Sequence, residues 1–192
     1  MDPQNDQELV YGSIFELCRE HGLAPICAVM LGHDGSMTRL LELAIAGPVS
    51  LQTIRQRVVA CPREAALHLD VKEGEEVNER DILMVHALNG QPLLHARSYT
   101  PLARLRPGFR EDMMRADIPI GKIMRAHKIE ARREILEVGY LENDQTLRSL
   151  LQTQGPYIWR RYNIITTGRP LITIRESLAV SRFREGSEAV KT

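Results

Sequence analysis

Apolar and polar positions alternate along two stretches of the chain, and each stretch contains a turn signal. The first covers residues 80–101 and contains Asn89-Gly90, a dipeptide typical of two-residue β-hairpin turns because both central residues need positive φ. The second covers residues 158–178 and turns near Thr167-Gly168-Arg169. The pattern therefore predicts two antiparallel hairpins.

Tight turns would fix which side chains share a face, since side chains alternate along a strand. In the first hairpin this register puts Arg80 and Arg97 on one face, among Ile82, Met84, His86, Leu93, His95 and Tyr99. In the second, it puts Glu176 on the face that carries Arg161, together with Ile172, Ile174, Asn163 and Ile165. A buried guanidinium needs an anionic partner, so both faces are candidates for an anion pocket.

The remaining pattern predicts helices and further strands that do not alternate regularly. Helical spacing or capping residues favour helices at 7–20, 36–46, 107–115 and 122–127, and one that starts after Asn143 or Asp144. Strands are expected at 49–59 and 129–139, and residues 61–77 are expected to form a loop with at most a short strand. This order favours an α+β fold around a mostly antiparallel sheet.

Composition limits the class of protein. The 192 residues, 43% hydrophobic, fit one domain (1–192), with a helical segment at 1–30 and a charged, disordered tail at 183–192. A net charge of zero gives no global attraction to nucleic acid or to a membrane surface. The three cysteines lack the spacing of a metal site or a disulfide framework, and the polar start is unlike a secretory signal. We therefore expect a cytoplasmic monomer or homodimer.

The chemistry that remains is carried by charged side chains on apolar strands. The sequence has no glycine-rich phosphate loop and no metal-ligand spacing, so neither a metal nor a cofactor is expected. Two turns, 32–37 and 117–121, precede helices whose first N–H groups could face an anion. Four arginines but only one glutamate are candidates on apolar strands: Arg80, Arg97, Arg133, Arg161 and Glu176. This imbalance fits a pocket for a small molecule with one or two carboxylates. Cross-strand ion pairs without catalytic duty are the alternative.

Five motifs in order resemble the chorismate pyruvate-lyase family, in its stand-alone branch that forms 4-hydroxybenzoate. They are DGSMTRLLE (34–42), RDILM (80–84), NGQPLLHARSYTPLARL (89–105), IPIGKIM (118–124) and GRPLITIRE (168–176). The resemblance covers most of residues 30–178. It implies a six-stranded antiparallel sheet flanked by helices and cleavage of chorismate to 4-hydroxybenzoate and pyruvate without metal or cofactor.

The resemblance also implies roles for single residues. Arg80 would hold the ring carboxylate together with the backbone N–H groups of Met37 and Ile120, and Arg97 would assist the second carboxylate. Glu176 would contact the ring hydroxyl and serve in proton transfer. Between Pro170 and Glu176 the chain is one residue longer than the better-known bacterial lyases, so a bulge must absorb the insertion if Glu176 is to face the pocket.

A related fold serves as the effector-binding domain of some bacterial transcription regulators. The alternative function is therefore a non-catalytic domain that binds a small aromatic acid. The thirty or so residues before Met37 leave no room for a winged-helix DNA reader, and the neutral net charge offers no basic face.

Overall fold

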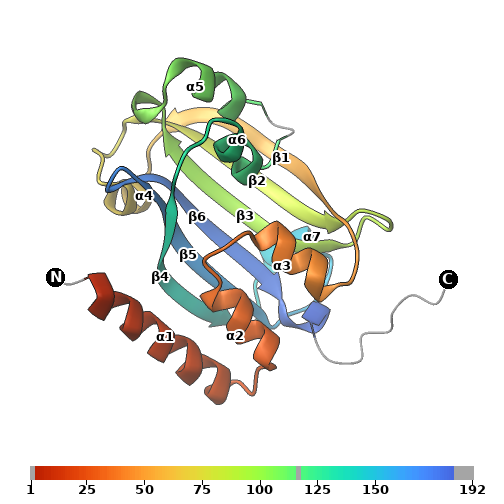
Figure 1. Cartoon of the computed structure of the whole chain (residues 1–192). Coiled ribbons are helices and arrows are strands. Elements are labelled where there is room, and N and C mark those ends of the chain that lie inside the picture. Colours follow the sequence, from red (N-terminus) through yellow and green to blue (C-terminus); the bar gives the residue numbers. More distant parts are fainter. Residues whose placement is uncertain (1–2, 116–117, 184–192) are drawn as a thin grey trace.

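A single six-stranded antiparallel sheet organises the structure, a computed structural model that describes residues 3–115 and 118–183 (Figure 1). The strand order is β1-β2-β3-β6-β5-β4. The strands are β1 (Val49–Ala60), β2 (Glu76–His86), β3 (Pro92–Pro101), β4 (Arg132–Leu141), β5 (Tyr157–Thr166) and β6 (Arg169–Ala179). The predicted α+β fold with a six-stranded antiparallel sheet is confirmed.

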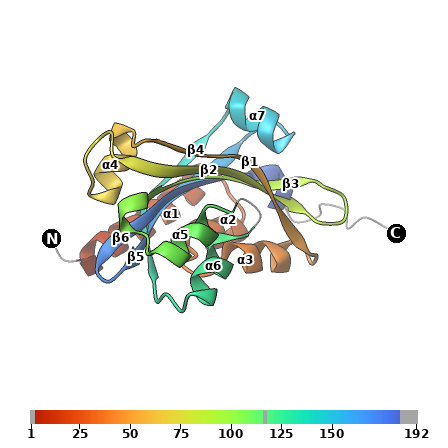
Figure 2. The same ribbon diagram turned by 90° about the horizontal axis from the view of Figure 1, so that it is seen from above.

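The helices cover the two faces of the sheet unequally. They are α1 (Pro3–Glu20), α2 (Pro25–Gly32), α3 (Met37–Ala44), α4 (Arg63–Leu69), α5 (Pro107–Met113), α6 (Ile120–Ala126) and α7 (Gln145–Leu151), with short 3₁₀ turns at Leu102–Arg104 and Val180–Phe183. Helices α1, α2, α3, α5 and α6 lie over one face, which we call the inner face, and α4 and α7 lie over the outer face (Figure 2).

The main core fills the space between the inner face and its helices. Apolar side chains from the central strands, such as Ile82, Ala96 and Ile174, pack there against α2, α3, α5 and α6. Two smaller clusters lie on the outer face under α4 and α7. Uneven coverage of this kind leaves room for a cavity wherever the inner helices stand away from the sheet.

Local sequence explains where several helices begin. Pro25 and Pro107 occupy the first turns of α2 and α5, positions where the missing proline N–H costs nothing. The side chains of Ser36 and Asp144 accept backbone N–H groups of α3 and α7 and so cap these helices. The helix expected after Asn143 or Asp144 is therefore confirmed, with Asp144 as the cap.

The expectation of a loop at 61–77 is wrong for its first half, which forms α4. Ala65, Ala66 and Leu69 are buried against Val77, and Asp70 ends the helix in the left-handed conformation. The signal was present in the sequence REAALHL, whose alanines and leucines are good helix formers. The helix has only seven residues, and the proline and glycine near it favoured the prediction of a loop.

The predicted register of the first hairpin is wrong by one residue. The turn is longer than two residues, because His86 N–H donates to the Gln91 carbonyl, and the Asn89 side chain accepts the Gln91 N–H. Two extra turn residues alone would preserve the alternation of side chains. However, Val85 pairs with Pro92 while Met84 pairs with Leu94, so Leu93 forms a bulge that inverts the alternation.

The bulge places Arg80 and Arg97 on opposite faces. Arg80 is paired with Ser98, and both side chains point to the inner face with Ile82 and Ala96. Arg97 is paired with Asp81 on the outer face. The prediction that the two arginines share a face is therefore corrected.

The second hairpin contains the same irregularity. Ile165 pairs with Pro170 while Ile164 pairs with Ile172, so Leu171 is the bulged residue. Glu176 therefore pairs with Arg160 and lies on the inner face, whereas Arg161 pairs with Arg175 on the outer face. The bulge required for Glu176 to face a pocket is present, and the predicted sharing of a face by Glu176 and Arg161 is wrong.

The disordered tail predicted at 183–192 begins one residue too early, because Phe183 is buried in the 3₁₀ turn Val180–Phe183. Residues 184–192 lie outside the described residues, so their predicted disorder stays a prediction. No helix within residues 3–115 and 118–183 combines the length and the apolar character needed to cross a bilayer.

Candidate functional site

A cavity of about 530 Å³ lies between the inner face and helices α3 and α6. Its floor is formed by inner-face side chains of β2, β3, β5 and β6, and part of its wall by the start of β1. The volume falls within the range of small-molecule sites, and the lining mixes apolar side chains with a few charged ones, as such sites do. This cavity is the candidate active site.

The starts of two helices face the cavity. Met37 is the first residue of α3 and Ile120 the first of α6, and both line the cavity. The first N–H groups of a helix have no acceptor within the helix and carry partial positive charge. Both predicted helix-start positions are thus brought to the same cavity, where their N–H groups can bind a carboxylate.

Arg80 enters the cavity from β2 and is almost fully buried, with 2% of its surface exposed. Its Nη1 donates to the carbonyl of Ile118, 2.8 Å away, just before α6. This contact ties the guanidinium to the segment that also presents Ile120. A carboxylate could therefore meet the Arg80 side chain and a helix start together.

Glu176 lies on the same cavity floor, held by two neighbours on β5. Its Oε2 accepts from Arg160 Nε at 2.8 Å, and its Oε1 accepts from the Tyr162 hydroxyl at 2.9 Å. Glu176 is 3% exposed and Arg160 is fully buried. Burial, followed by the charge of Glu176, raises the pKa of Tyr162 well above its usual range, so the hydroxyl remains a neutral donor. The carboxylate is thus fixed in position by a cation and a hydroxyl.

The distance between Arg80 and Glu176 follows from the sheet itself. Arg80 pairs with Ser98, whereas Glu176 pairs with Ala96, so the two residues are two strands apart and offset by two positions. With strands about 4.8 Å apart and a rise of about 3.4 Å per residue, their Cα atoms are separated by about 12 Å. A six-membered ring can therefore lie between the two side chains.

Arg133 reaches the cavity from β4. Its Nη1 donates to the Asp34 carbonyl at 3.1 Å, and its guanidinium carbon lies 6.0 Å from the centre of the Tyr162 ring. Its Nε is buried and has no hydrogen-bond partner among the described residues. The hydrogen-bonding capacity of Arg133 is therefore not fully used by the described residues.

The cavity lining carries an excess of positive charge. Among residues 3–115 and 118–183, five cationic side chains and two carboxylates line it. One carboxylate, Glu42, pairs with Arg39 at 2.9 Å, and the other, Glu176, pairs with Arg160 from outside the lining. The cationic residues are Arg39, Arg80, Lys122, Arg125 and Arg133. The arrangement suits a ligand with two negative charges.

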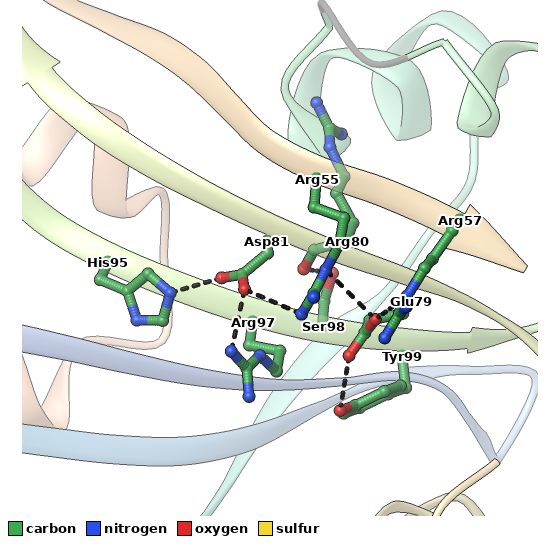
Figure 3. A network of polar contacts seen from close by, with 9 residues as sticks. All are labelled: Arg55, Arg57, Glu79, Arg80, Asp81, His95, Arg97, Ser98 and Tyr99. Carbon is green, nitrogen blue, oxygen red and sulfur yellow. Dashed lines mark hydrogen bonds and ion pairs between the residues drawn. The ribbon is translucent and has the colours of Figure 1, made fainter. Parts of the chain in front are cut away.

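Two predicted site residues, Arg97 and Arg161, do not reach this cavity. Figure 3 shows the outer-face network, where Arg97 Nη2 lies 2.9 Å from Asp81 Oδ2 and His95 binds the other oxygen of Asp81. Burial alone would raise the pKa of Asp81, but His95 and Arg97 outweigh it and hold this pKa below its usual range. Arg161 pairs with Glu64 and with Glu137. Both arginines lie on the outer face because of the bulges at Leu93 and Leu171.

Two residues of the inner-face site, Arg160 and Tyr162, were missed by the sequence analysis. A regular hairpin would place Arg161 on the face of Glu176, and Arg160 and Tyr162 on the other face. The bulge at Leu171 reverses this relation, so Arg160 and Tyr162 share a face with Glu176. The signal was the doublet Arg160-Arg161, because one of two adjacent strand arginines must face each side. Over residues 3–115 and 118–183, no cluster of His, Cys, Asp and Glu side chains could hold a metal ion.

Comparisons with known proteins place the chain in a family. The family profile described as chorismate pyruvate-lyase, Rv2949c-like, matches residues 30–184. A relative named "Putative lyase MJ0807", from Methanocaldococcus jannaschii, is 35% identical over 178 residues, 90% of this chain and 88% of that protein. A chorismate pyruvate-lyase of Mycobacterium tuberculosis is 24% identical over 161 residues, 82% of this chain and 81% of that protein.

A solved structure supports the fold independently. A GntR-family transcriptional regulator from Bacillus cereus superposes with a TM-score of 0.57 at 17% identity, over 75% of this chain and 99% of that one. At this identity the likeness concerns the fold alone. The family match covers the cavity, its helix starts and both hairpins, and the chain therefore belongs to the Rv2949c-like chorismate pyruvate-lyase family.

Proposed function

We propose that the protein is a lyase that cleaves chorismate to 4-hydroxybenzoate and pyruvate in the inner-face cavity. The observation that carries the proposal is the placement of Arg80 and Glu176 on one cavity floor, beside the starts of α3 and α6. The family match and the relative named chorismate pyruvate-lyase support the same substrate.

The cationic lining provides separate positions for the two carboxylates of chorismate. The ring carboxylate binds Arg80 and the N–H groups of Met37 and Ile120. The enolpyruvyl carboxylate binds Arg133, whose buried Nε has no partner among the described residues. Arg133 thus takes the position that the sequence analysis gave to Arg97, which the structure places on the outer face. Charge-assisted contacts of this kind fix a planar acid in one orientation.

The ring hydroxyl is placed next to Glu176 when the ring carboxylate is bound at Arg80. The hydrogen on the hydroxyl-bearing carbon moves to the methylene carbon of the enolpyruvyl group while the ether bond between ring and enolpyruvyl oxygen breaks. The electrons of the C–H bond complete the aromatic ring, and those of the ether bond form the carbonyl of pyruvate. Aromatisation supplies the driving force, so the protein contributes mainly positioning and assistance to one proton transfer.

Arg160 and Tyr162 make Glu176 suitable for this role. Both of its oxygens are already hydrogen-bonded at 2.8 and 2.9 Å, so the carboxylate cannot rotate freely. A carboxylate fixed in this way orients the substrate hydroxyl without reorganising during the reaction. These two β5 residues are positioning residues, since they act through Glu176.

The test uses a pair of arginines on neighbouring strands. Purified protein with chorismate and no added metal is expected to release pyruvate and 4-hydroxybenzoate in equal amounts. Arg80→Ala is expected to lower kcat/KM about 10²-fold or more, because the residue fixes a carboxylate in the transition state. The matched control, Arg97→Ala, removes an arginine from the outer face and is expected to keep activity within about threefold.

Each contrary result has a distinct meaning. Full activity of Arg80→Ala contradicts the assigned site, whereas absence of pyruvate from the native protein contradicts the function. Folding of both variants is checked by circular dichroism and thermal unfolding.

The second candidate is the alternative stated from the sequence, a domain that binds a small aromatic acid in the same cavity without turnover. Tight binding of 4-hydroxybenzoate in calorimetry, combined with no pyruvate release from chorismate, would support this second candidate against the lyase. Arg80→Ala is expected to abolish that binding as well, because both functions use the same cavity.

A further inference from the structure

A second cavity, of about 280 Å³, lies on the outer face and is lined by residues of α4 and α7. Its floor consists of side chains from β3, β6 and β5, and its walls include Glu64 from α4 and Asp144 from the start of α7. The sheet separates it from the inner-face cavity, so the lyase proposed above makes no use of it.

The floor of this outer cavity contains three arginines side by side. Arg175 on β6 pairs with Arg97 on β3 and with Arg161 on β5, so the three side chains form one row across the sheet. Like charges directly opposite each other on neighbouring strands destabilise a sheet unless anions offset them. The row therefore needs negative charge.

Protein carboxylates satisfy only two members of this row. Arg97 pairs with Asp81, and Arg161 pairs with Glu64 and Glu137. Arg175 forms no ion pair with any described residue, and its guanidinium carbon instead lies 4.2 Å from the centre of the Trp159 ring. Burial, and then the charge of Arg161, lower the pKa of Arg175, while the charges of Glu64, Asp144 and Glu137 oppose this shift.

Two buried polar atoms in the lining also lack partners. The Nε atom of Arg97 and the hydroxyl of Thr173 are buried and have no hydrogen-bond partner within the described part of the chain. Thr173 is 2% exposed and, like Arg97, lines the cavity. Buried polar groups are nearly always hydrogen-bonded, and those that are not call for an explanation such as a missing ligand. The two unsatisfied groups lie two positions apart on the outer face of β3 and β6.

The wall carries the opposite charge. Asp144 is half-buried, lines the cavity and uses one oxygen, Oδ1, to cap α7 through the Leu147 N–H at 2.8 Å. It forms no ion pair with the described residues, whereas the other acidic wall residue, Glu64, is already bound to Arg161. A ligand in this cavity thus meets cations on the floor and one available carboxylate at the wall.

We propose that the outer cavity is a binding site for a small amino acid in its zwitterionic form. The ligand carboxylate binds the guanidinium groups of Arg97 and Arg175 and the hydroxyl of Thr173, and the ligand ammonium group binds Asp144. The volume corresponds to about nine water molecules at about 30 Å³ each, which sets the size at about ten non-hydrogen atoms. A doubly charged anion is disfavoured because the wall would repel it.

The proposal is tested on the full chain with three probes that differ by one group. L-alanine carries both charges, propionate lacks the amino group, and L-alaninamide lacks the carboxylate. Each is titrated at pH 7.5 while backbone amide signals are followed by NMR. L-alanine is expected to shift the amides of Arg97, Thr173 and Arg175, with propionate binding more weakly and L-alaninamide weakest.

Variants separate the two halves of the site. Arg175→Gln is expected to weaken L-alanine binding about tenfold or more, since a hydrogen bond to a charged group contributes about 1.5–3 kcal/mol and about 1.4 kcal/mol is tenfold. Asp144→Asn keeps a side-chain oxygen for the helix cap but removes the charge. It is expected to weaken L-alanine binding, which loses the partner of its ammonium group, and to strengthen propionate binding slightly, because the wall no longer repels an anion.

Two further variants serve as a milder change in the outer cavity and as a control in the inner cavity. Thr173→Val removes only a hydroxyl at nearly constant volume, so it tests the site even if Arg175→Gln fails to fold. Arg80→Gln changes the inner cavity and is expected to leave the alanine-induced shifts of the outer face unchanged.

Several outcomes would overturn the proposal. They are the absence of amide shifts around Thr173 at 50 mM L-alanine, equal affinity of the native protein for L-alanine and L-alaninamide, and unchanged alanine affinity in both Arg175→Gln and Thr173→Val. Because chorismate turnover is not among the measurements, the result is independent of whether the protein is a lyase.

Discussion

The two faces of strands β3, β6 and β5 use arginine for different purposes. On the outer face, Arg97 and Arg161 each contact one or more carboxylates from neighbouring strands or from α4. On the inner face, the described part of the cavity lining contains five cationic side chains and two carboxylates. A strand arginine by itself therefore does not mark the inner-face site, because Arg97 and Arg161 already have carboxylate partners.

The adjacent pair Arg160 and Arg161 shows the difference within two residues. Arg160 is fully buried and binds Glu176, whose carboxylate is itself 3% exposed. Arg161 is also buried, but its partner Glu64 lies on the surface with 69% of its side chain exposed. The first ion pair is removed from water on both sides and the second on one side only. The cost of breaking each pair should differ accordingly.

The largest effect on stability is expected from variants that break these two ion pairs one at a time. Arg160→Met should lower the free energy of unfolding by about 3–5 kcal/mol, because it leaves the Glu176 carboxylate buried without a cation. Arg161→Met should cost about 1 kcal/mol, since water can solvate Glu64 and Glu137. Urea denaturation of both variants gives the two values.

A double variant shows whether the buried charge is the cause. Arg160→Met combined with Glu176→Gln is expected to recover much of the lost stability, because no uncompensated charge remains. Equal losses in Arg160→Met and Arg161→Met would contradict the contrast between the faces.

The second effect concerns activity and rests on the proposed lyase function. Arg133→Gln removes a cation from the inner cavity and should lower kcat/KM for chorismate about tenfold or more, or about 1.4 kcal/mol, because a substrate carboxylate loses its partner. Arg161→Gln removes a cation from the outer face and should leave kcat/KM within about threefold. A coupled assay for pyruvate measures both. A larger loss in Arg161→Gln would mean that the two faces are functionally connected.

The smallest effect is on the pH dependence of stability. His95 and Arg97 hold the pKa of Asp81 below its usual range despite the opposing effect of burial. An unfolded aspartate has a pKa of about 3.9, so this contribution is fully present above about pH 4 and is lost as the pH falls through the lower, folded value. The free energy of unfolding should therefore decline between pH 5 and pH 2. Asp81→Asn should make this decline less steep, by the equivalent of less than one bound proton. An unchanged slope in Asp81→Asn would assign the acid sensitivity to other carboxylates.

The sequence predicted the elements of this fold better than their register. Alternation located both hairpins, and the caps at Ser36 and Asp144 located two helices. The faces of the hairpins were predicted wrongly, because a bulge adds one residue without changing the apolar character of the strand. The alternation of apolar residues does not mark Leu93 and Leu171, but each directly follows a proline, Pro92 or Pro170, and proline within a strand often accompanies a bulge.

The candidate site was predicted in part. Met37, Arg80, Ile120, Arg133 and Glu176 all line the inner cavity. The resemblance to a family was the stronger guide for Glu176, because it required a bulge that the turn signal did not indicate. Long-range contacts such as that between Arg133 and the Asp34 carbonyl depend on how helices pack on the sheet, and no local pattern contains that information.

The bulges at Leu93 and Leu171 also restrict how the two hairpins can change length during evolution. Insertion or deletion of two residues near either turn preserves the orientation of every side chain beyond it. A change of one residue rotates the whole downstream strand by half a turn and exchanges the lining of one cavity for that of the other. Homologues with hairpins of different length should therefore differ by even numbers of residues, or should gain or lose a bulge at the same time.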